Sequence, residues 1–264
     1  MNVTEFENYT ERLRASLESV AGVIGLVTLG STADPTFRDE WSDHDFWVIT
    51  DPGMQDSLVE DLSWLPDYQN ILFAVSHLPH GRNILFRNRH MVEFAVFDTI
   101  EVNSRKLERY RILLGGDQIT ELIANVHRET HRQAKLRPEA LENLCLVIWS
   151  ACELHARGEL LHARQYIDGF AINQLLNLLY SETSDERKDA LDPRRRVELR
   201  APGLAAELLE SYSKPVPDAA LHMLEIVERE LRPKAPELAW DKAAIVRSWI
   251  KPSTDYTDLD LQSV

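Results

Sequence analysis

The sequence predicts an α+β protein in which a small mixed-sheet domain is followed by an all-α helical bundle. Short runs rich in β-branched and aromatic residues fill the first 100 residues or so, as in β-strands. From about residue 118 the apolar residues instead recur with the helical period of 3.6. A length of 264 residues is comfortable for two domains. We expect domains at 1–117 and 118–252, with an acidic tail at 253–264.

The N-terminal domain begins with an amphipathic helix over residues 4–21, because Phe6, Leu13, Leu17 and Val20 fall roughly on one stripe. A helix is also expected at 55–65, ending before Pro66. Residues 88 and 89 separate two apolar runs, which indicates a β-hairpin. The predicted strands are 23–30, 46–50, 70–78, 83–87 and 90–97.

The C-terminal domain is expected to contain an antiparallel pair of long helices. The first, over 138–156, starts at a proline and ends before Gly158, which suits the position just after a helix. Cys145 and Cys152 are about two helical turns apart, so they are interpreted as core thiols rather than a disulfide. The second helix follows Gly158, and its predicted core positions are Leu161, Ile167, Phe170, Leu175 and Leu178. A polar loop is expected at 183–202, followed by shorter helices at 203–212, 217–231 and 238–250.

The composition excludes several classes of function. With 44% hydrophobic and 27% charged residues the chain is typical of soluble globular proteins, and no apolar run approaches the length of a membrane span. A net charge of −14 opposes nucleic acid, which is normally bound through a basic surface. It favours a small or cationic partner. The N-terminus does not resemble a signal peptide, so a cytoplasmic location is expected.

One segment carries the pattern of a nucleotide-binding site. Gly30 and Ser31 end an apolar strand, and eleven residues separate them from Asp43, which is followed by Asp45 at the start of the next strand. Residues i and i+2 of a strand point to the same side, so the two carboxylates would face one spot. Mg²⁺ is commonly bound by one or two carboxylates together with substrate phosphates. The Gly-Ser turn offers backbone N–H groups and a hydroxyl to a phosphate tail.

Nucleotidyl transfer also needs a base for the attacking hydroxyl or a further metal ligand. Glu93 lies inside an apolar strand, where an unpartnered charge is costly to bury, so it is the favoured third acid. Asp98, at the end of that strand, is more easily a solvated terminator. The alternative for Glu93 is an edge strand with its acid facing water.

These residues carry a family resemblance. The segments GSTADPTFRDEWSDHDFWVIT and ILFRNRHMVEFAVF resemble the DNA polymerase beta-type nucleotidyltransferase superfamily, and within it the aminoglycoside 6-adenylyltransferases. The matching positions are Gly30, Ser31, the run from Asp39 to Ser42, Asp43, Asp45 and Glu93. The third acid is often aspartate in that family, whereas it is glutamate here. The likeness covers mainly the first 100 residues.

The resemblance implies a mechanism. Asp43 and Asp45 bind Mg²⁺ that bridges the triphosphate of ATP or another nucleotide, while Gly30 and Ser31 hold the outer phosphates. Glu93 accepts the proton of the acceptor hydroxyl or completes a second metal site. The acceptor is a small hydroxylated molecule, with a cationic aminoglycoside as one candidate, which would imply antibiotic resistance. A regulatory or antitoxin-type protein, which modifies a protein partner or binds nucleotide without turnover, is the alternative. The oligomeric state is left open.

A second motif, HRETH, places His127 and His131 one helical turn apart and could bind zinc. The metalloprotease pattern has glutamate directly after the first histidine, whereas Glu129 comes one position later here. A zinc site is therefore the weaker hypothesis.

Overall fold

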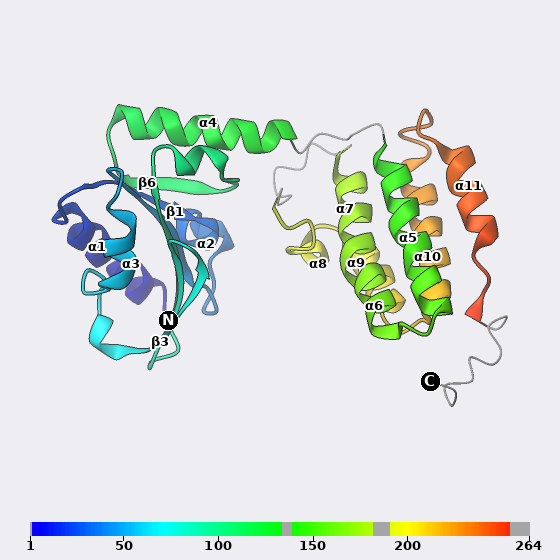
Figure 1. The fold of residues 1–264 in the computed structure, drawn as a ribbon, viewed down its shortest axis with the longest axis horizontal. Helices are drawn as coiled ribbons and strands as arrows, with labels where there is room; N and C mark the ends of the chain where they lie inside the picture. Colours follow the sequence, from blue (N-terminus) through cyan, green and yellow to red (C-terminus); the bar gives the residue numbers. More distant parts are fainter. Residues whose placement is uncertain (1, 134–138, 182–190, 254–264) are drawn as a thin grey trace. The chain divides into compact units, whose positions relative to one another are not determined.

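The computed structural model describes residues 2–133, 139–181 and 191–253. The chain divides into two compact units, Met1–Gln133 and Ala134–Val264. The first is built on a six-stranded mixed sheet, and every regular element described in the second is a helix (Figure 1). The expected α+β fold class is confirmed.

The sheet of the first unit has the strand order β3-β4-β5-β2-β1-β6. Strands β2 and β5 pair in parallel, and the other neighbouring strands pair antiparallel. The hairpin β4–β5 turns at residues 87–90, where it was expected from the sequence. Strand β6 is an addition to the predicted set. The bounds are β1 Val23–Leu29, β2 His44–Thr50, β3 Ile71–Leu78, β4 Gly81–Phe86, β5 Met91–Asp98 and β6 Tyr110–Leu114.

Helices cover both faces of this sheet. Helices α1 (Val3–Glu18) and α3 (Gln55–Glu60) pack on one face, where Leu13 of α1 lies in the same core cluster as Phe46 and Val48 of β2. Helix α4 (Asp117–Gln133) packs on the other, where Ile123 joins Trp47 of β2. We call these the α1 face and the α4 face. Alternate residues of β2 point to opposite faces, as strand geometry requires.

The boundary between the units differs from the expected one at 117/118. Helix α4 belongs to the sheet unit, because its residues Ile119, Ile123 and Val126 are at most 4% exposed and share a core cluster with β1, β2 and β5. Helical periodicity marks where an element begins but does not say which core that element completes. Of the expected tail, residues 254–264 lie outside the described part of the chain.

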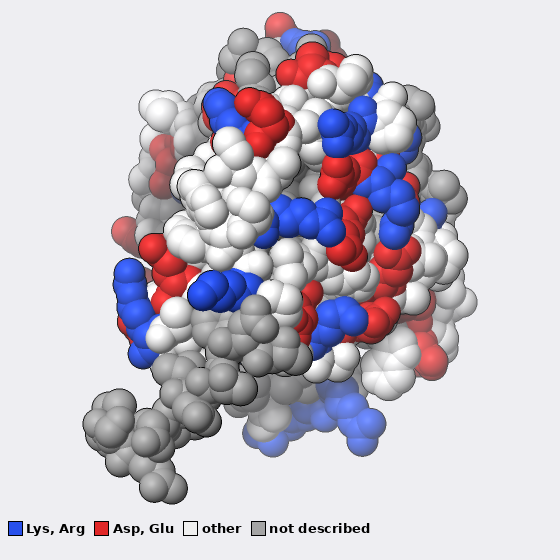
Figure 2. Space-filling view, turned by 90° about the vertical axis from the view of Figure 1, so that its right-hand side faces the viewer, with Lys and Arg blue, Asp and Glu red and all other residues white. Residues whose placement is uncertain are grey.

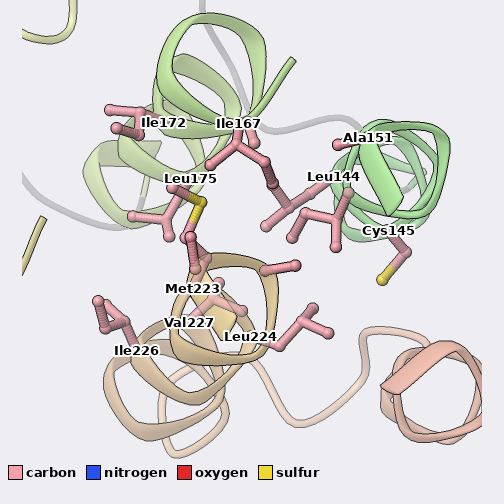
Figure 3. Close-up of a cluster of buried hydrophobic side chains, with 14 of the residues drawn as sticks. Leu144, Cys145, Ala151, Ile167, Ile172, Leu175, Met223, Leu224, Ile226 and Val227 are labelled. Atoms are coloured by element: carbon pink, nitrogen blue, oxygen red, sulfur yellow. The ribbon is translucent and has the colours of Figure 1, made fainter. Parts of the chain in front are cut away.

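The second unit is a helical bundle. Its core contains Leu144 of α5, Ile167 of the π-helix described next, Leu175 of α7 and Met223 of α10 (Figure 3). A seven-residue π-helix, Gln165–Ala171, continues α6 into α7. The helices are α5 Ala140–Ala156, α6 Leu160–Arg164, α7 Ile172–Ser181, α8 Val197–Arg200, α9 Pro202–Ser211, α10 Val216–Leu231 and α11 Trp240–Trp249.

Two of the predicted core positions are wrong. Ile167, Leu175 and Leu178 are buried, but Leu161 is 90% exposed and Phe170 is 45% exposed. Leu161 is six residues before Ile167, which at 3.6 residues per turn places it on a different side of the helix. Phe170 lies in the π-helix, whose wider winding moves residues three apart off a common face.

The expected helix end at Gly158 is confirmed, because this residue has a φ of +79° and links α5 to α6. Cys145 and Cys152 are free and buried, as expected, and burial raises the pKa of their thiols to about 11 and about 12. Of the expected polar loop, residues 183–190 lie outside the described residues, and α8 forms in the remainder.

Acidic and basic side chains alternate over one face of the molecule (Figure 2). Ion pairs join helices of the second unit, including Arg247 with Glu225 at 2.6 Å and Lys242 with Glu142 at 3.0 Å. Pairs this exposed contribute little individually to the free energy of unfolding. Within the described residues, no helix has the length and apolar character that crossing a membrane would require.

Candidate active site at the start of β2

The two aspartates of the motif lie where β2 begins. Asp43 immediately precedes the strand, and Asp45 is its second residue. Both residues are partly exposed, unlike the buried residues that follow them. Asp45 has the same strand parity as Trp47 and Ile49, which lie in the α4-face core. The carboxylate of Asp45 therefore belongs to the α4 face of the sheet.

Glu93 lies beside Asp45 on the neighbouring strand. The parallel register of β2 and β5 pairs Asp45 directly with Glu93, and paired residues of adjacent strands share a face. Glu93 also alternates with Val92 and Phe94, which are buried on the α1 face. The third acid of the predicted site thus lies on the same face as Asp45.

The alternative interpretation of Glu93 is wrong about the position of its strand. Strand β5 lies between β4 and β2 in the sheet, so it is not an edge strand. The side chain of Glu93 is nevertheless 39% exposed, because the α4 face is open at this end of the strand. A carboxylate in such a place is available to a ligand.

Asp98 has the structural role that the sequence suggested. Its carboxylate accepts hydrogen bonds from the backbone N–H groups of Ile100 and Glu101, both at 2.8 Å. These bonds, with that to Glu101 first, hold the pKa of Asp98 below its usual value. The residue terminates β5 and lies at the opposite end of the strand from Met91.

Thr32 fastens the Gly-Ser turn to the aspartate segment. It lies in the short helix α2 (Gly30–Ala33), and its Oγ1 accepts a hydrogen bond from the N–H of Asp45 at 2.9 Å. The same hydroxyl donates to the carbonyl of Asp43 at 3.2 Å. One side chain therefore connects the two halves of the motif across eleven residues of sequence.

Gly30 adopts a conformation that few other residues tolerate, with a φ of +50°. Its N–H donates to the carbonyl of Arg109 at 3.1 Å, in the segment that precedes β6. That N–H is consequently not free for a phosphate, contrary to the sequence-based expectation of two available N–H groups. The contribution of Gly30 is to turn the chain so that Ser31 follows at the end of β1.

Arg38 holds the loop between the turn and the aspartates in place. Its guanidinium donates to the carbonyls of Ser31 and Thr32, each at 3.3 Å, and forms an ion pair with Glu7 of α1. The guanidinium also lies over the ring of Phe6, with its central carbon 4.3 Å from the ring centre. The side chain is only 3% exposed, so these contacts are largely shielded from water.

His77 of β3 lies next to Glu93, with 3.4 Å between its Nε2 and the Oε1 of Glu93. On β4, Asn83 pairs with Glu93 in the antiparallel register. The side-chain oxygen of Asn83 is buried and finds no hydrogen-bond partner among the described residues. Polar groups thus surround Glu93 on the side away from Asp45.

Two buried histidines support the site from the α1 face. The Nδ1 of His44 is 2.8 Å from the Nε2 of His90, and the Nε2 of His44 is 3.0 Å from the hydroxyl of Thr10. Burial lowers the pKa of His44 to about 2 and that of His90 to about 4, so both rings are neutral at pH 7. They pack the start of β2 and do not face the carboxylates.

The donor set suits Mg²⁺ only in part. Among the described residues, no three histidine, cysteine, aspartate or glutamate side chains are grouped closely enough to hold a metal ion. Carboxylate oxygens are nevertheless the ligands that Mg²⁺ prefers, and this ion is usually held by one or two carboxylates with substrate phosphates. Asp43 and Asp45 fit that arrangement.

The HRETH histidines form a hydrogen-bonded pair. The Nε2 atoms of His127 and His131 are 3.0 Å apart, and Glu108 lies 3.5 Å from His131. Burial, followed by the neighbouring His131, lowers the pKa of His127. In the described part of the chain these groups do not qualify as a metal site.

Sequence reasoning missed Thr32, Arg38 and His77. Thr32 directly follows the Gly-Ser pair, and a hydroxyl residue beside a tight turn is a recognisable hydrogen-bonding signal. Arg38 and His77 carry no such signal, because their partners Glu7 and Glu93 are 31 and 16 residues away along the chain. Only the folded sheet brings them together.

Comparisons with known proteins give two structural likenesses. No protein-family model and no curated protein matches the chain. An aminoglycoside 6-adenyltransferase from Bacillus subtilis aligns with 94% of this chain and 97% of its own, at 11% identity and a TM-score of 0.40. A nucleotidyltransferase-like protein from Exiguobacterium sibiricum aligns with 87% of this chain and 77% of its own, at 11% identity and a TM-score of 0.37. Likenesses of this strength assign no activity to the chain.

Proposed function

We propose that this protein is a Mg²⁺-dependent nucleotidyltransferase that moves a nucleoside monophosphate, AMP from ATP, to a hydroxyl of a small molecule. The observation that carries the proposal is the pairing of Asp45 with Glu93 on one open face of the sheet. Thr32 ties the Gly-Ser turn to that same segment. Metal ligands, a phosphate-binding turn and a candidate base therefore adjoin one another.

Each residue has a role in this reaction. Asp43 and Asp45 would hold Mg²⁺, which when bound neutralises charge on the phosphates and on the leaving pyrophosphate. Ser31 offers its hydroxyl to the outer phosphates, and Gly30 sets the turn that presents it. Glu93 takes the proton of the acceptor hydroxyl as the oxygen attacks the α-phosphorus. Pyrophosphate leaves from the opposite side, and the nucleoside monophosphate remains on the acceptor oxygen.

The net charge of −14 favours a cationic acceptor, so an aminoglycoside is the first candidate, with a role in resistance to such compounds. The test is pyrophosphate release from each nucleoside triphosphate with Mg²⁺ and a panel of aminoglycosides and neutral sugars. Asp45→Asn should lower release by about a hundredfold or more, the scale for losing a group that stabilises transition-state charge. Asp56→Asn, at a carboxylate whose side chain is 82% exposed, is the control.

Full Mg²⁺-dependent release by Asp45→Asn would overturn the assigned site. If the wild-type protein binds ATP and releases no pyrophosphate with any small acceptor, the function is wrong, and a regulatory protein that binds nucleotide without turnover is favoured. The Asp45→Asn result is interpreted only if that variant is folded, as shown by an unchanged unfolding midpoint.

A further inference from the structure

His77 reaches the candidate active site from the edge of the sheet. It lies on β3, whereas Glu93 lies on β5, and β4 runs between these two strands. Neighbouring strands are about 4.8 Å apart, so the two backbones are separated by roughly 10 Å. The Nε2 of His77 is nevertheless 3.4 Å from the Oε1 of Glu93. The two side chains therefore meet over β4, on the α4 face of the sheet.

Gly81 provides the space for this meeting. A Cβ built on Gly81 would lie 2.7 Å from the Cε1 and 3.0 Å from the Nε2 of His77. These distances are well under the roughly 3.5–4.0 Å at which non-bonded carbon atoms pack. Gly81 is buried at the start of β4 and does not have a positive φ, so its backbone conformation does not require glycine. Glycine is needed here because the imidazole ring lies directly on it.

The contact with His77 draws the carboxylate of Glu93 away from Asp45. In the sheet, β4 and β2 lie on opposite sides of β5, and Asp45 is the paired neighbour of Glu93 on β2. Because the imidazole ring lies over Gly81 of β4, a carboxylate oxygen that touches the ring leans toward β4. Like charges at paired positions of neighbouring strands repel, which favours the same direction.

The Glu93 side chain thus has two places for its carboxylate. Turned toward β2, the carboxylate would join Asp45 as a ligand of bound Mg²⁺, since this ion is held by carboxylate oxygens. Turned toward His77, it stays off the metal and keeps an oxygen for a proton. The side chain of Glu93 is 39% exposed, so packing fixes its conformation only in part. The contact with His77 favours the second place.

We propose that His77 is a positioning residue, which holds the carboxylate of Glu93 away from the Mg²⁺ position at Asp45 and so reserves it for proton acceptance. With a proton on Nε2, the imidazole donates toward Oε1 of Glu93 and leaves Oε2 for the acceptor hydroxyl. The separation of 3.4 Å exceeds the usual N–H···O distance of about 2.7–3.2 Å, but hydrogen bonds in active sites often tighten once substrate is bound. The role in proton acceptance rests on the proposed function, whereas the position of the carboxylate does not.

The first test measures metal binding and needs no turnover. Mn²⁺, a spectroscopic substitute for Mg²⁺, is titrated into the full chain, and the free ion is followed by electron paramagnetic resonance. His77→Ala releases Glu93 toward the metal position. We therefore expect Mn²⁺ to bind this variant about three- to tenfold more tightly than the wild-type protein, because a further carboxylate ligand becomes available. The gain should vanish when His77→Ala is made in a Glu93→Gln background.

The second test measures pyrophosphate release. His77→Ala should lower kcat about ten- to a hundredfold, the scale for a misplaced reacting group, and should leave the KM for the nucleotide within about twofold. His77→Gln should recover most of the activity, because its amide nitrogen extends about as far from the backbone as Nε2 and is also a donor. His77→Asn should not, because its side chain is shorter.

Gly81→Ala displaces the imidazole ring without altering a polar group. It should reproduce both effects of His77→Ala and should add nothing once residue 77 is alanine. Gly116→Ala is its control, because a Cβ on Gly116 meets no atom within 4 Å. The Cβ of Leu78 also lies 3.0 Å from the new methyl group, so the unfolding midpoint of each variant is measured. If Gly81→Ala does not fold, the His77 variants decide.

His80 is the matched control for His77. It lies in the turn between β3 and β4, and its side chain is 24% exposed, against 25% for His77. The Nδ1 of His80 is 3.3 Å from the Oε1 of Glu101, a carboxylate outside the candidate site. His80→Ala should therefore change neither Mn²⁺ affinity nor pyrophosphate release.

The proposal is overturned if His77→Ala leaves either Mn²⁺ affinity or kcat unchanged, if the gain in affinity persists without Glu93, or if His80→Ala has equal effects. Equal activities of the glutamine and asparagine variants would also overturn it. Failure of the proposed function has a different signature: the wild-type protein releases no pyrophosphate with any nucleotide, while His77→Ala still raises Mn²⁺ affinity through Glu93. Release that depends on Asp45 but not on His77 would keep the function and remove the role of His77.

Discussion

The hydroxyl of Thr32 accepts a hydrogen bond from the backbone N–H of Asp45 at 2.9 Å. The same hydroxyl donates to the carbonyl of Asp43 at 3.2 Å, so one side chain joins the Gly-Ser turn to the aspartate pair. Thr32 is itself fully buried. A site assembled from two distant pieces of chain is thereby given a fixed geometry, which positioning of phosphates over carboxylates requires.

Replacing Thr32 by valine should therefore lower both stability and transfer. Valine has nearly the same shape but leaves the N–H of Asp45 without this acceptor, at a cost of about 1–3 kcal/mol in the free energy of unfolding. Urea unfolding monitored by circular dichroism gives that difference. Thr32→Ser keeps the hydroxyl and should recover most of the pyrophosphate release, and equal losses for valine and serine would show that the hydroxyl is not what matters.

Glu93→Gln distinguishes a proton acceptor from a metal ligand. The side chain of Glu93 is 39% exposed and its residue pairs with Asp45, so we expect it to act as the base of the proposed reaction. The glutamine variant should lose about 10²–10⁴-fold in kcat, with the Mg²⁺ concentration for half-activation unchanged within about twofold. Glu121→Gln, at an exposed position of α4, is the control. Recovery of full kcat at high Mg²⁺ would instead identify Glu93 as a ligand.

Gly30→Ala and Gly203→Ala should have opposite effects on stability. Gly30 has a φ of +50°, where a Cβ costs roughly 1–2 kcal/mol. Gly203 lies in α9, and a Cβ there meets no atom within 4 Å. Alanine at that position should stabilise the helix by about 0.4–1 kcal/mol, since it lowers the entropy of the unfolded chain. Thermal unfolding of both variants measures the contrast, and an unchanged or higher unfolding midpoint for Gly30→Ala would refute this account of Gly30.

The two buried histidines predict a loss of stability in mild acid. Their folded-state pKa values, about 2 for His44 and about 4 for His90, lie below the unfolded value of roughly 6.5. The unfolded chain therefore binds more protons than the folded one as the pH falls below about 6.5. Each histidine then costs on the order of 1.4 kcal/mol per pH unit, down to about pH 4 for His90.

The control for this pH dependence is His90→Gln, which removes one of the two groups. Its unfolding free energy should fall less steeply between pH 7 and pH 5 than that of the wild-type protein, by up to about 1.4 kcal/mol per pH unit. Urea denaturation at several pH values supplies both slopes. Parallel slopes would mean that His90 is not held neutral in the folded state.

Arg38→Met should destabilise the loop that carries the aspartates. The guanidinium is almost fully buried against Glu7, Ser31 and Thr32, so its loss leaves two carbonyls and a carboxylate without a donor. We expect a cost of about 2–4 kcal/mol, somewhat less than for a fully buried ion pair because Glu7 is 45% exposed. Arg14→Met, on an exposed side of α1, is the control and should cost less than about 1 kcal/mol.

The local part of the site could be predicted from the sequence. A glycine at the end of an apolar strand predicts a tight turn, and two aspartates at i and i+2 of a strand predict side chains on the same side. Both patterns involve only a few neighbouring residues. Glu93 was selected because a charge within an apolar strand needs a reason, and the register then paired it with Asp45. The helix end at Gly158 and the burial of both cysteines were equally local conclusions.

Other features depended on contacts that the sequence does not encode locally. Helix α4 was assigned to the wrong domain. Its apolar stripe indicates that the helix packs against a core, but does not indicate which of the two cores it joins. Phe170 was placed in a core because the π-helix that turns it outward has no sequence period of its own.

The sequence alone was enough to predict the fold class, the Gly-Ser turn, the two aspartates as site residues and Glu93 as the third acid. It could do so because each depends on strand alternation or on backbone conformation over a few residues. Tertiary structure alone decided that Glu93 stands beside Asp45 and that Thr32 joins the turn to the strand. Those relationships arise from strand order and register, which are set by packing among residues tens of positions apart.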